Sequence, residues 1–288
     1  MGIHGMNLHS NPKRIFPLND ASPPITLLLQ EISHEVEQNG AGTGSRTWES
    51  SIAMSAYFAS KPDLLMGNVI EIGSGVGLGG ILSFLFRSMS SSTAPFHSMT
   101  LSDCKLQVLN HCNENVRSFI KSYPSFSSIS VAELDWYDIL KKIAGASKHS
   151  EHYDTVIACD CAYDYTDIEA LVGTLKGLLK KKTTSKAHIF GPSSRGGLHK
   201  LISQLREETC FSIEMEHIEM VRYRLDPPRE KDSLRSLDDL RRAILPIDDN
   251  SNGKFHSKFD SEFLHVTCSL RLDSDAAIRK EAPLRDID

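Results

Sequence analysis

A short run near residue 70 constrains the fold of this chain more than any other segment. Residues 68–80 read NVIEIGSGVGLGG, an apolar stretch that leads into a glutamate and then a series of glycines. Glycine lets the backbone turn sharply and approach a ligand closely, because it has no Cβ. A helix that starts after such a turn presents free backbone N–H groups, which suit a carboxylate or a phosphate. The sequence therefore predicts a strand, a turn and a helix that together bind a nucleotide-like cofactor.

The spacing of the glycines fits two classes of cofactor. Starting at Gly75, the run matches the G-x-G-x-x-G pattern of dinucleotide-binding proteins, and Asp103 follows at about the distance expected for a ribose contact. Starting at Glu71, it matches E-x-G-x-G-x-G, a pattern used for S-adenosylmethionine (AdoMet). Glu71 favours AdoMet, since a carboxylate repels a pyrophosphate but can support the turn or face an ammonium group. A glycine turn without a ligand is the third interpretation, because a lone glycine motif is weak evidence.

The rest of the chain alternates between strand and helix patterns, as a doubly wound parallel sheet does. Strands are expected at residues 68–73, 99–103, 129–136, 153–160 and 187–190. Helices are expected at residues 45–61, 79–87, 106–119, 167–179 and 198–208. Two later segments, 211–223 and 262–272, alternate β-branched or aromatic residues with polar ones and suit antiparallel strands. The predicted fold is α/β, a Rossmann-like doubly wound seven-stranded sheet with an antiparallel C-terminal strand pair.

The length favours one α/β domain with extensions over two domains, since the chain has 288 residues. We expect an N-terminal extension at residues 1–40, the α/β domain at 41–272 and a polar C-terminal tail at 273–288. The charged segment 224–260 has few core residues, and we interpret it as a partly disordered insertion between the last two strands.

Composition excludes several classes of function. The net charge is −5 and the pI is about 6.2, which is unlike a nucleic-acid-binding protein. No apolar run approaches the ~20 residues that span a bilayer, and no secretory signal is present. The six cysteines are therefore expected to be reduced, and no zinc-like spacing accompanies the Cys159-x-Cys161 pair, so no metal site is expected. The expectation is a cytoplasmic monomer.

Acidic residues stand at or near the ends of four consecutive predicted strands: Glu71, Asp103, Asp135 and Asp160. In an open α/β sheet this edge binds ligands, and although one such acid can be a helix cap, four in succession favour a site. Asp103 would accept hydrogen bonds from two ribose hydroxyls. Asp135 would bind the adenine amino group, with Trp136 packing on the base. Trp136 can also be interpreted as a core residue.

Taken in order, the strings TWES, EIGSGVGLGG, LSDC, ELDW and YDTVIACDCAY resemble the seven-β-strand class I methyltransferases. The chain is most similar to the protein-lysine methyltransferases that modify elongation factors, chaperones and calmodulin, over about residues 46–272. The resemblance implies AdoMet as cofactor and a lysine side chain of a protein substrate as acceptor. LSDC and ELDW are closer to the elongation-factor-modifying members and IFGPSSRGG to the calmodulin-modifying ones, so the target protein stays open.

The resemblance also assigns roles to individual positions. Trp48 corresponds to the tryptophan that lines the AdoMet pocket, and Cys159 to the residue that contacts the cofactor just before the fourth-strand acid. Together, motif and resemblance give these cofactor-binding residues: Trp48, Glu71, Gly73, Ser74, Gly75, Gly77, Asp103, Asp135, Trp136 and Cys159. The D-x-x-Y signature of the family corresponds to residues 160–163, so that Asp160 and Tyr163 are the expected catalytic residues.

The chemistry of lysine methylation suits this D-x-x-Y assignment. A lysine amine has a pKa of about 10.4 and must lose its proton before it can accept a methyl group. Asp160 can orient the incoming ammonium, but an anion raises the pKa of a lysine, so water is the expected proton acceptor. Tyr163 can line the lysine channel and favour a cation against its ring, or it can pack at the start of a helix.

Other functions fit the sequence less well. Nucleic-acid N-methyltransferases usually carry (N/D)-P-P-(Y/F) where this chain has DCAY, which lacks prolines. A small-molecule methyltransferase, an NAD-dependent dehydrogenase and a non-catalytic AdoMet-binding module are the remaining alternatives. The insertion at 224–260 and the Ser-rich loop at 88–98 are not general features of the family, and they leave the substrate surface undefined.

Overall fold

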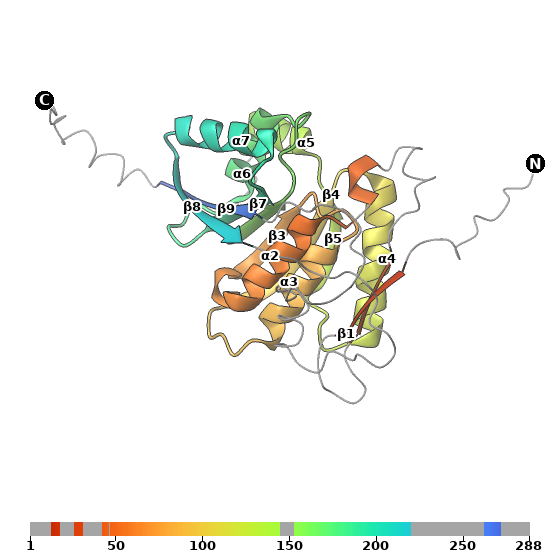
Figure 1. Ribbon diagram of the computed structural model, residues 1–288. Helices are drawn as coiled ribbons and strands as arrows, with labels where there is room; N and C mark the ends of the chain where they lie inside the picture. The colour runs from red at the N-terminus through yellow and green to blue at the C-terminus, as the bar shows by residue number, and fades with distance from the viewer. Residues whose placement is uncertain are drawn as a thin grey trace, which may run out of the picture.

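The computed structural model describes residues 13–17, 26–30, 42–45, 47–144, 153–219 and 262–271. Within these residues, seven strands form one sheet in the order β5-β4-β3-β6-β7-β9-β8 (Figure 1). The strands are β3 (Gly67–Ile72), β4 (Phe96–Asp103), β5 (Ile129–Glu133), β6 (Thr155–Cys159), β7 (Lys186–Pro192), β8 (Phe211–Glu219) and β9 (Glu262–Leu270). The first five are parallel, and β9 pairs antiparallel with both β7 and β8. The predicted Rossmann-like fold with an antiparallel C-terminal pair is confirmed.

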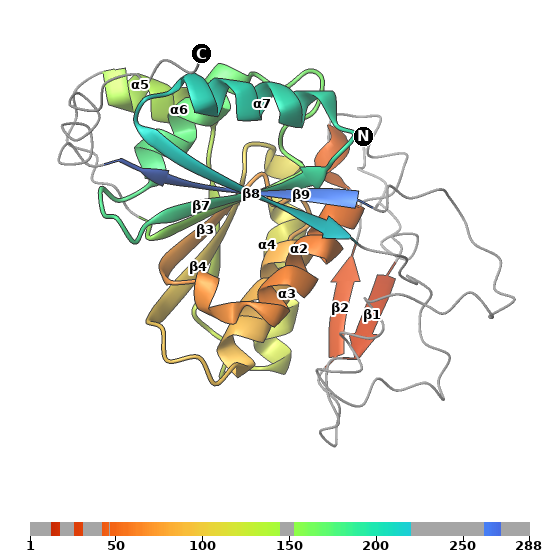
Figure 2. The same ribbon diagram turned by 60° about the vertical axis from the view of Figure 1, so that its left-hand side comes forward.

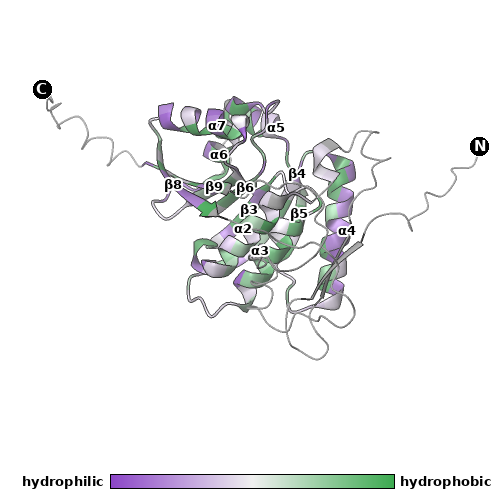
Figure 3. Ribbon diagram, in the orientation of Figure 1, coloured by the Kyte–Doolittle hydropathy of each residue, from purple (hydrophilic) through white to green (hydrophobic). Residues whose placement is uncertain are grey.

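Helices cover both faces of the sheet (Figure 2). One face carries α2 (Glu49–Ser60), α3 (Leu78–Met89) and α4 (Leu106–Ser122), and the other carries α5 (Trp136–Ala144), α6 (Ile168–Leu178) and α7 (Gly196–Glu207). Successive strand residues point to opposite faces, so Val69 joins the first core cluster and Ile70 the second. The strands buried in this way are largely hydrophobic, while α4 and α7 also carry hydrophilic residues (Figure 3).

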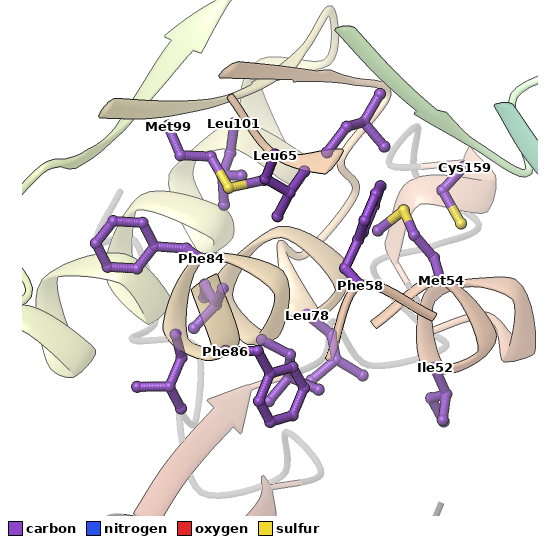
Figure 4. Close-up of a cluster of buried hydrophobic side chains, with 14 of the residues drawn as sticks. Ile52, Met54, Phe58, Leu65, Leu78, Phe84, Phe86, Met99, Leu101 and Cys159 are labelled. Carbon is purple, nitrogen blue, oxygen red and sulfur yellow. The ribbon is translucent and has the colours of Figure 1, made fainter. Parts of the chain in front are cut away.

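The core on the α2–α3 face lies under the part of the sheet that carries the sequence motifs. Met54 and Phe58 of α2, Phe84 of α3 and Leu101 of β4 belong to one hydrophobic cluster, and all four side chains are fully buried (Figure 4). Burying a side chain of this size contributes about 1.5–3 kcal/mol to folding. This packing fixes the start of both helices at the carboxyl edge of the parallel strands.

The third predicted strand is wrong at its C-terminal end. β5 ends at Glu133, and Trp136 begins the helix α5, which the sequence analysis did not predict. Asp135 explains the change, because its Oδ1 accepts a hydrogen bond from the Tyr137 backbone N–H at 2.8 Å. Such a side-chain bond to an N–H of the first turn favours helix initiation.

The Ser-rich loop predicted at residues 88–98 is shorter in the structure, because β4 already begins at Phe96. The guanidinium of Arg87 holds this connection in place. It donates hydrogen bonds to the Leu65 carbonyl at 3.0 Å, to the Ser90 hydroxyl at 3.1 Å and to the Ala94 carbonyl. The buried cation thus fastens the end of α3 to the start of β4.

At the N-terminal end, two strands that were not predicted, β1 (Lys13–Pro17) and β2 (Thr26–Gln30), pair antiparallel, and β2 lies beside α4 (Figure 2). Two short 3-10 turns, η3 (Gly42–Ser45) and η4 (Pro62–Leu64), flank α2. The predicted insertion at 224–260 and tail at 273–288 lie outside the described residues, so the domain boundaries stay predictions. None of the helices in the described ranges is long and apolar enough to cross a membrane.

Candidate active site

The glycine loop that follows β3 depends on the absence of side chains. Gly73, Gly75 and Gly77 all have positive φ angles, of 64°, 56° and 91°. A Cβ on Gly73 would lie 2.7 Å from the sulfur of Cys161, and one on Gly75 would lie 3.0 Å from the carbonyl oxygen of Gly44. Both the backbone conformation and the close contacts therefore require glycine here.

Backbone hydrogen bonds hold this loop against the neighbouring strand. The Ser74 N–H donates to the Ser102 carbonyl of β4 at 2.8 Å, and the Gly77 N–H donates to the Ser74 carbonyl at 3.0 Å. Gly77 then serves as the N-cap of α3, with no side-chain cap. The strand, turn and helix predicted from the sequence are thus confirmed.

Glu71 lies beneath the loop and is only 1% exposed. Its carboxyl group faces the first turn of α3, where it hydrogen-bonds to the backbone N–H of Gly80. The pKa of Glu71 is raised to about 8, mainly by burial; the Gly80 N–H lowers it and the nearby charge of Asp103 adds to the rise. Glu71 is therefore mostly protonated at neutral pH and supports the turn, while a direct contact with a cofactor ammonium stays a prediction.

Asp103 ends β4 directly beside the glycine loop. Its Oδ2 accepts a hydrogen bond from the Gly75 N–H at 3.2 Å, and its Oδ1 accepts one from the Lys105 N–H at 3.1 Å. Burial raises the pKa of the Asp103 carboxyl, and the backbone N–H groups oppose that rise. The structure thus places the predicted ribose-binding acid next to the loop, and its contact with a ribose stays a prediction.

Trp48 connects the start of α2 with the η3 turn. Its indole N–H donates to the Thr43 carbonyl at 2.9 Å, and its ring is half-buried. In the same turn, a Cβ on Gly44 would lie 3.2 Å from the Val108 side chain and 3.6 Å from the Asp103 carboxylate, and the Gly44 carbonyl lies close to Gly75. The predicted pocket tryptophan therefore belongs to a segment that contacts the glycine loop.

The predicted adenine contacts lie one strand further along the edge. Asp135 is exposed and caps α5, while Trp136 is half-buried and packs against the core on the α6–α7 face. A backbone hydrogen bond of 3.1 Å from Leu134 to the Asp103 carbonyl keeps this corner close to the ribose-binding acid. The structure supports the core interpretation of Trp136, and a role for either residue in base binding stays a prediction.

The D-x-x-Y signature begins where β6 ends. Cys159 is buried on the face towards α2, with its sulfur 4.0 Å from the Ser51 hydroxyl, and burial raises the pKa of this thiol well above its usual value (Figure 4). Asp160 follows with a φ of +51°, the one positive φ angle of a non-glycine residue in the described ranges. Its N–H donates to the Phe190 carbonyl at 2.8 Å. Backbone conformations of this kind are uncommon outside glycine and cluster at functional sites.

The Asp160 carboxylate has two side-chain partners that the sequence analysis missed. The Ser50 hydroxyl donates to Oδ2 at 3.2 Å, and Nη2 of Arg195 donates to the same oxygen at 3.1 Å. The guanidinium also lies 3.1 Å from Oδ1, which is buried without a hydrogen-bond partner in the described structure. Burial raises the pKa of the Asp160 carboxyl, and the Arg195 charge works in the opposite direction. In the sequence, the only signs of these two partners are a serine that follows the letters TWE and an arginine that follows the fifth predicted strand.

Tyr163 lies in the loop between β6 and α6, with 37% of its side chain exposed. Its N–H donates to the Thr166 hydroxyl at 3.0 Å, and α6 begins only at Ile168, so Tyr163 is not a helix-start residue. A Cβ on Gly197 would lie 2.6 Å from the carbonyl oxygen of Tyr163. This glycine lets the start of α7, which carries Arg195 as its N-cap, approach the D-x-x-Y loop.

Comparison with known proteins adds an independent line of evidence. The profile of a family described as lysine methyltransferase matches residues 30–195. A calmodulin-lysine N-methyltransferase of Arabidopsis thaliana is 26% identical over 178 residues, which cover 62% of this chain and 54% of the relative. EEF1A lysine methyltransferase 3 of Mus musculus is 26% identical over 170 residues, which cover 58% of each chain. The chain spans about half the length of the curated relatives it matches.

Among solved structures, an O-methyltransferase from Bacillus cereus in complex with SAH matches with a TM-score of 0.44 and 11% sequence identity. The match covers 82% of this chain and 88% of that one.

Proposed function

The chain belongs to the lysine methyltransferase family, and on that basis we propose that it transfers a methyl group from AdoMet to a lysine side chain of a protein. The observation that carries the proposal is the carboxyl edge of the sheet. There the glycine loop and Asp103 lie at the ends of β3 and β4, and a separate carboxylate, that of Asp160, lies just after the end of β6 with 8% of its side chain exposed. A site for a cofactor and a site for an acceptor can thus share one edge.

The residues around the loop fit AdoMet. Gly73, Gly75 and Gly77 form a left-handed turn that carries no side chain at these three positions, and Asp103 offers a carboxylate to a ribose. When bound, AdoMet supplies an electrophilic methyl group on a sulfonium. The acidic Asp103 suits a cofactor with a cationic sulfonium and an ammonium group better than it suits the pyrophosphate of a dinucleotide, while the buried Glu71 supports the turn. Trp48, Asp135, Trp136 and Cys159 are the further residues proposed to hold the cofactor.

The D-x-x-Y loop is the part of the site that receives the substrate lysine. With AdoMet bound, the lysine nitrogen would take the methyl group as the bond from that group to sulfur breaks, which would leave a neutral thioether. The proton of the amine passes to water. Asp160 orients the amine, and the exposed ring of Tyr163 lines its approach. Correct alignment of the nitrogen, the methyl group and the sulfur is the main task of such a site.

The proposal extends to the kind of substrate. The relatives are named for calmodulin and for EEF1A, so these two proteins are the first acceptors to test. A cytosolic, monomeric enzyme is part of the same proposal. All six cysteines are free, which fits a reducing compartment.

The test is to incubate the purified chain with methyl-labelled AdoMet and a nuclease-treated protein extract, and to read the label on a denaturing gel. Purified calmodulin and EEF1A serve as defined acceptors in parallel lanes. We expect a discrete labelled band, weakened at least about a hundredfold in Asp160→Ala because the amine is no longer aligned. AdoMet binding, measured by calorimetry, should be retained in that variant. Cofactor binding without any protein label would instead indicate a small-molecule acceptor or a binding module.

A further inference from the structure

Arg195 lies against the carboxylate that is proposed to receive the substrate amine. It approaches from the N-cap of α7, across the D-x-x-Y loop, and its Nη2 is 3.1 Å from each oxygen of Asp160. The Asp160 side chain is 8% exposed and that of Arg195 is 32% exposed, so the ion pair is screened from water mainly on the aspartate side. A buried carboxylate therefore meets its counter-charge inside the protein before any substrate arrives.

The pair is incomplete in its hydrogen bonds. Oδ2 of Asp160 accepts from both Ser50 and Arg195, whereas Oδ1 and the Nε of Arg195 are buried without partners in the described structure. Buried polar atoms normally find partners, and leaving them unpaired is costly. A free acceptor on a buried, charge-paired carboxylate is a suitable position for an N–H group of a ligand.

We infer that Arg195 is a positioning residue that compensates the charge of Asp160, so that Oδ1 accepts a hydrogen bond from the target lysine as a neutral amine. This inference rests on the proposed function. A lone carboxylate would favour the ammonium form of the lysine, which cannot attack a methyl group. An arginine stays charged across the whole range in which lysine titrates, so the compensation does not lapse with pH.

The other titratable groups near Asp160 do not supply this compensation. They are Cys159 at the end of β6, Cys161 just after it, Glu71 of β3, and Tyr163 and Asp164 of the following loop. Burial raises the pKa of both thiols well above their usual value, so they stay neutral. Of the groups named here, Arg195 is the cation.

The test compares variants across pH. Initial rates of labelling are measured from about pH 6 to pH 10, with saturating AdoMet and saturating nuclease-treated extract as acceptor, so that the rate reports the pKa of the bound lysine. Each variant rate is divided by the wild-type rate at the same pH, which cancels the titration of Glu71 and of the extract. For Arg195→Gln we expect a rate ratio about tenfold lower near neutral pH that recovers towards high pH, since the lysine pKa rises by about one unit.

Two further variants separate charge from structure. Arg195→Lys keeps the positive charge and should keep the wild-type pH midpoint, even if its rate is lower. Ser50→Ala removes a neutral hydrogen bond to the same oxygen, so it should lower the rate by one factor at every pH. AdoMet affinity and thermal unfolding are measured for all three, to show that each variant is folded and binds its cofactor.

Two results would overturn the inference. A rate ratio for Arg195→Gln that is reduced equally at every pH would make Arg195 a structural residue only. A ratio above one at every pH, with a lower KM for the acceptor, would show that Arg195 competes with the lysine. If the wild-type protein labels no protein at all, the proposed function itself fails, and that outcome is distinct from both.

Discussion

Each end of β3 combines a glycine with an aspartate, but the two aspartates differ in whether a counter-charge lies beside them. At the start of the strand, Gly67 has a φ of +61° and Asp154 accepts the Asn68 N–H at 2.9 Å. After its end, Gly75 has a φ of +56° and Asp103 accepts the Gly75 N–H at 3.2 Å. Each end thus combines a left-handed glycine with an aspartate that binds a backbone N–H.

The difference lies in the counter-charge. Lys180 is 2.6 Å and Lys182 3.9 Å from the Asp154 carboxylate, and despite partial burial these lysines and the Asn68 N–H leave its pKa below the usual value. Asp103 has no ion pair within the described ranges, and burial raises its pKa. The first aspartate is a structural anchor whose charge is already matched. The second keeps its acceptor capacity for a ligand, which is what a cofactor site requires.

The largest expected effect separates these two aspartates. Asp103→Ala should weaken AdoMet binding about a hundredfold, because a hydrogen bond to a charged group contributes about 1.5–3 kcal/mol. Asp154→Ala is the matched control, with an unchanged affinity and a lower melting temperature. Calorimetric titration and thermal unfolding measure both quantities. Equal AdoMet affinities in the two variants would contradict the assignment of Asp103 to the ribose.

The next effect concerns Glu71, which also lies near the ligand end of β3. Its folded-state pKa of about 8 exceeds the ordinary value of 4.5, so stability is lost as pH rises between these values. Glu71→Gln removes that loss, so the stability of the variant relative to the wild type should rise by roughly 3 kcal/mol from pH 5 to pH 8, on top of a cost for burying the amide that is the same at both pH values. Denaturant unfolding at the two pH values measures this. Identical pH slopes would contradict the buried, protonated state.

A smaller effect is expected at the two glycines. Gly75→Ala should lower AdoMet affinity about tenfold, because a side-chain-bearing residue at this φ costs about 1–2 kcal/mol and its Cβ would press on Gly44. Gly67→Ala has the same backbone strain and would meet Asp154, so it should destabilise the fold without changing the affinity for AdoMet. The comparison fails if the variant at residue 67 is the one that loses affinity.

The smallest effect tests the edge beyond β4. Asp135→Ala should cost about 1 kcal/mol of stability through the lost helix cap. If Asp135 also binds adenine, calorimetry should in addition show an AdoMet affinity several-fold below that of the wild type. An unchanged affinity would leave Asp135 as a cap only.

The ligand end of β3 was predictable from the sequence because it is built from backbone. Glycines are needed where the chain turns and where atoms approach closely, and they are visible as letters at fixed spacing. The alternation of apolar segments likewise predicted the sheet, since it reflects burial on two faces. Glu71 and Asp103 lie where that pattern placed them.

The site around Asp160, which is proposed to bind the acceptor lysine, was harder to predict because it is built from side chains that are distant in sequence. Ser50 is 110 positions and Arg195 is 35 positions from Asp160, and no local pattern links them. The helix α5 was missed because its first residues, Trp136 and Tyr137, also suit a strand, and only the cap by Asp135 decides between the two.

The most direct test of the account is to identify the amino acid that carries the label. The labelled band is excised, hydrolysed in acid and separated alongside methylated lysine, arginine and histidine standards. The account predicts that the label migrates with methylated lysine and is absent when Asp160→Ala replaces the wild-type protein. Label in another amino acid, or label that is released by mild base as a carboxyl ester would be, would contradict it.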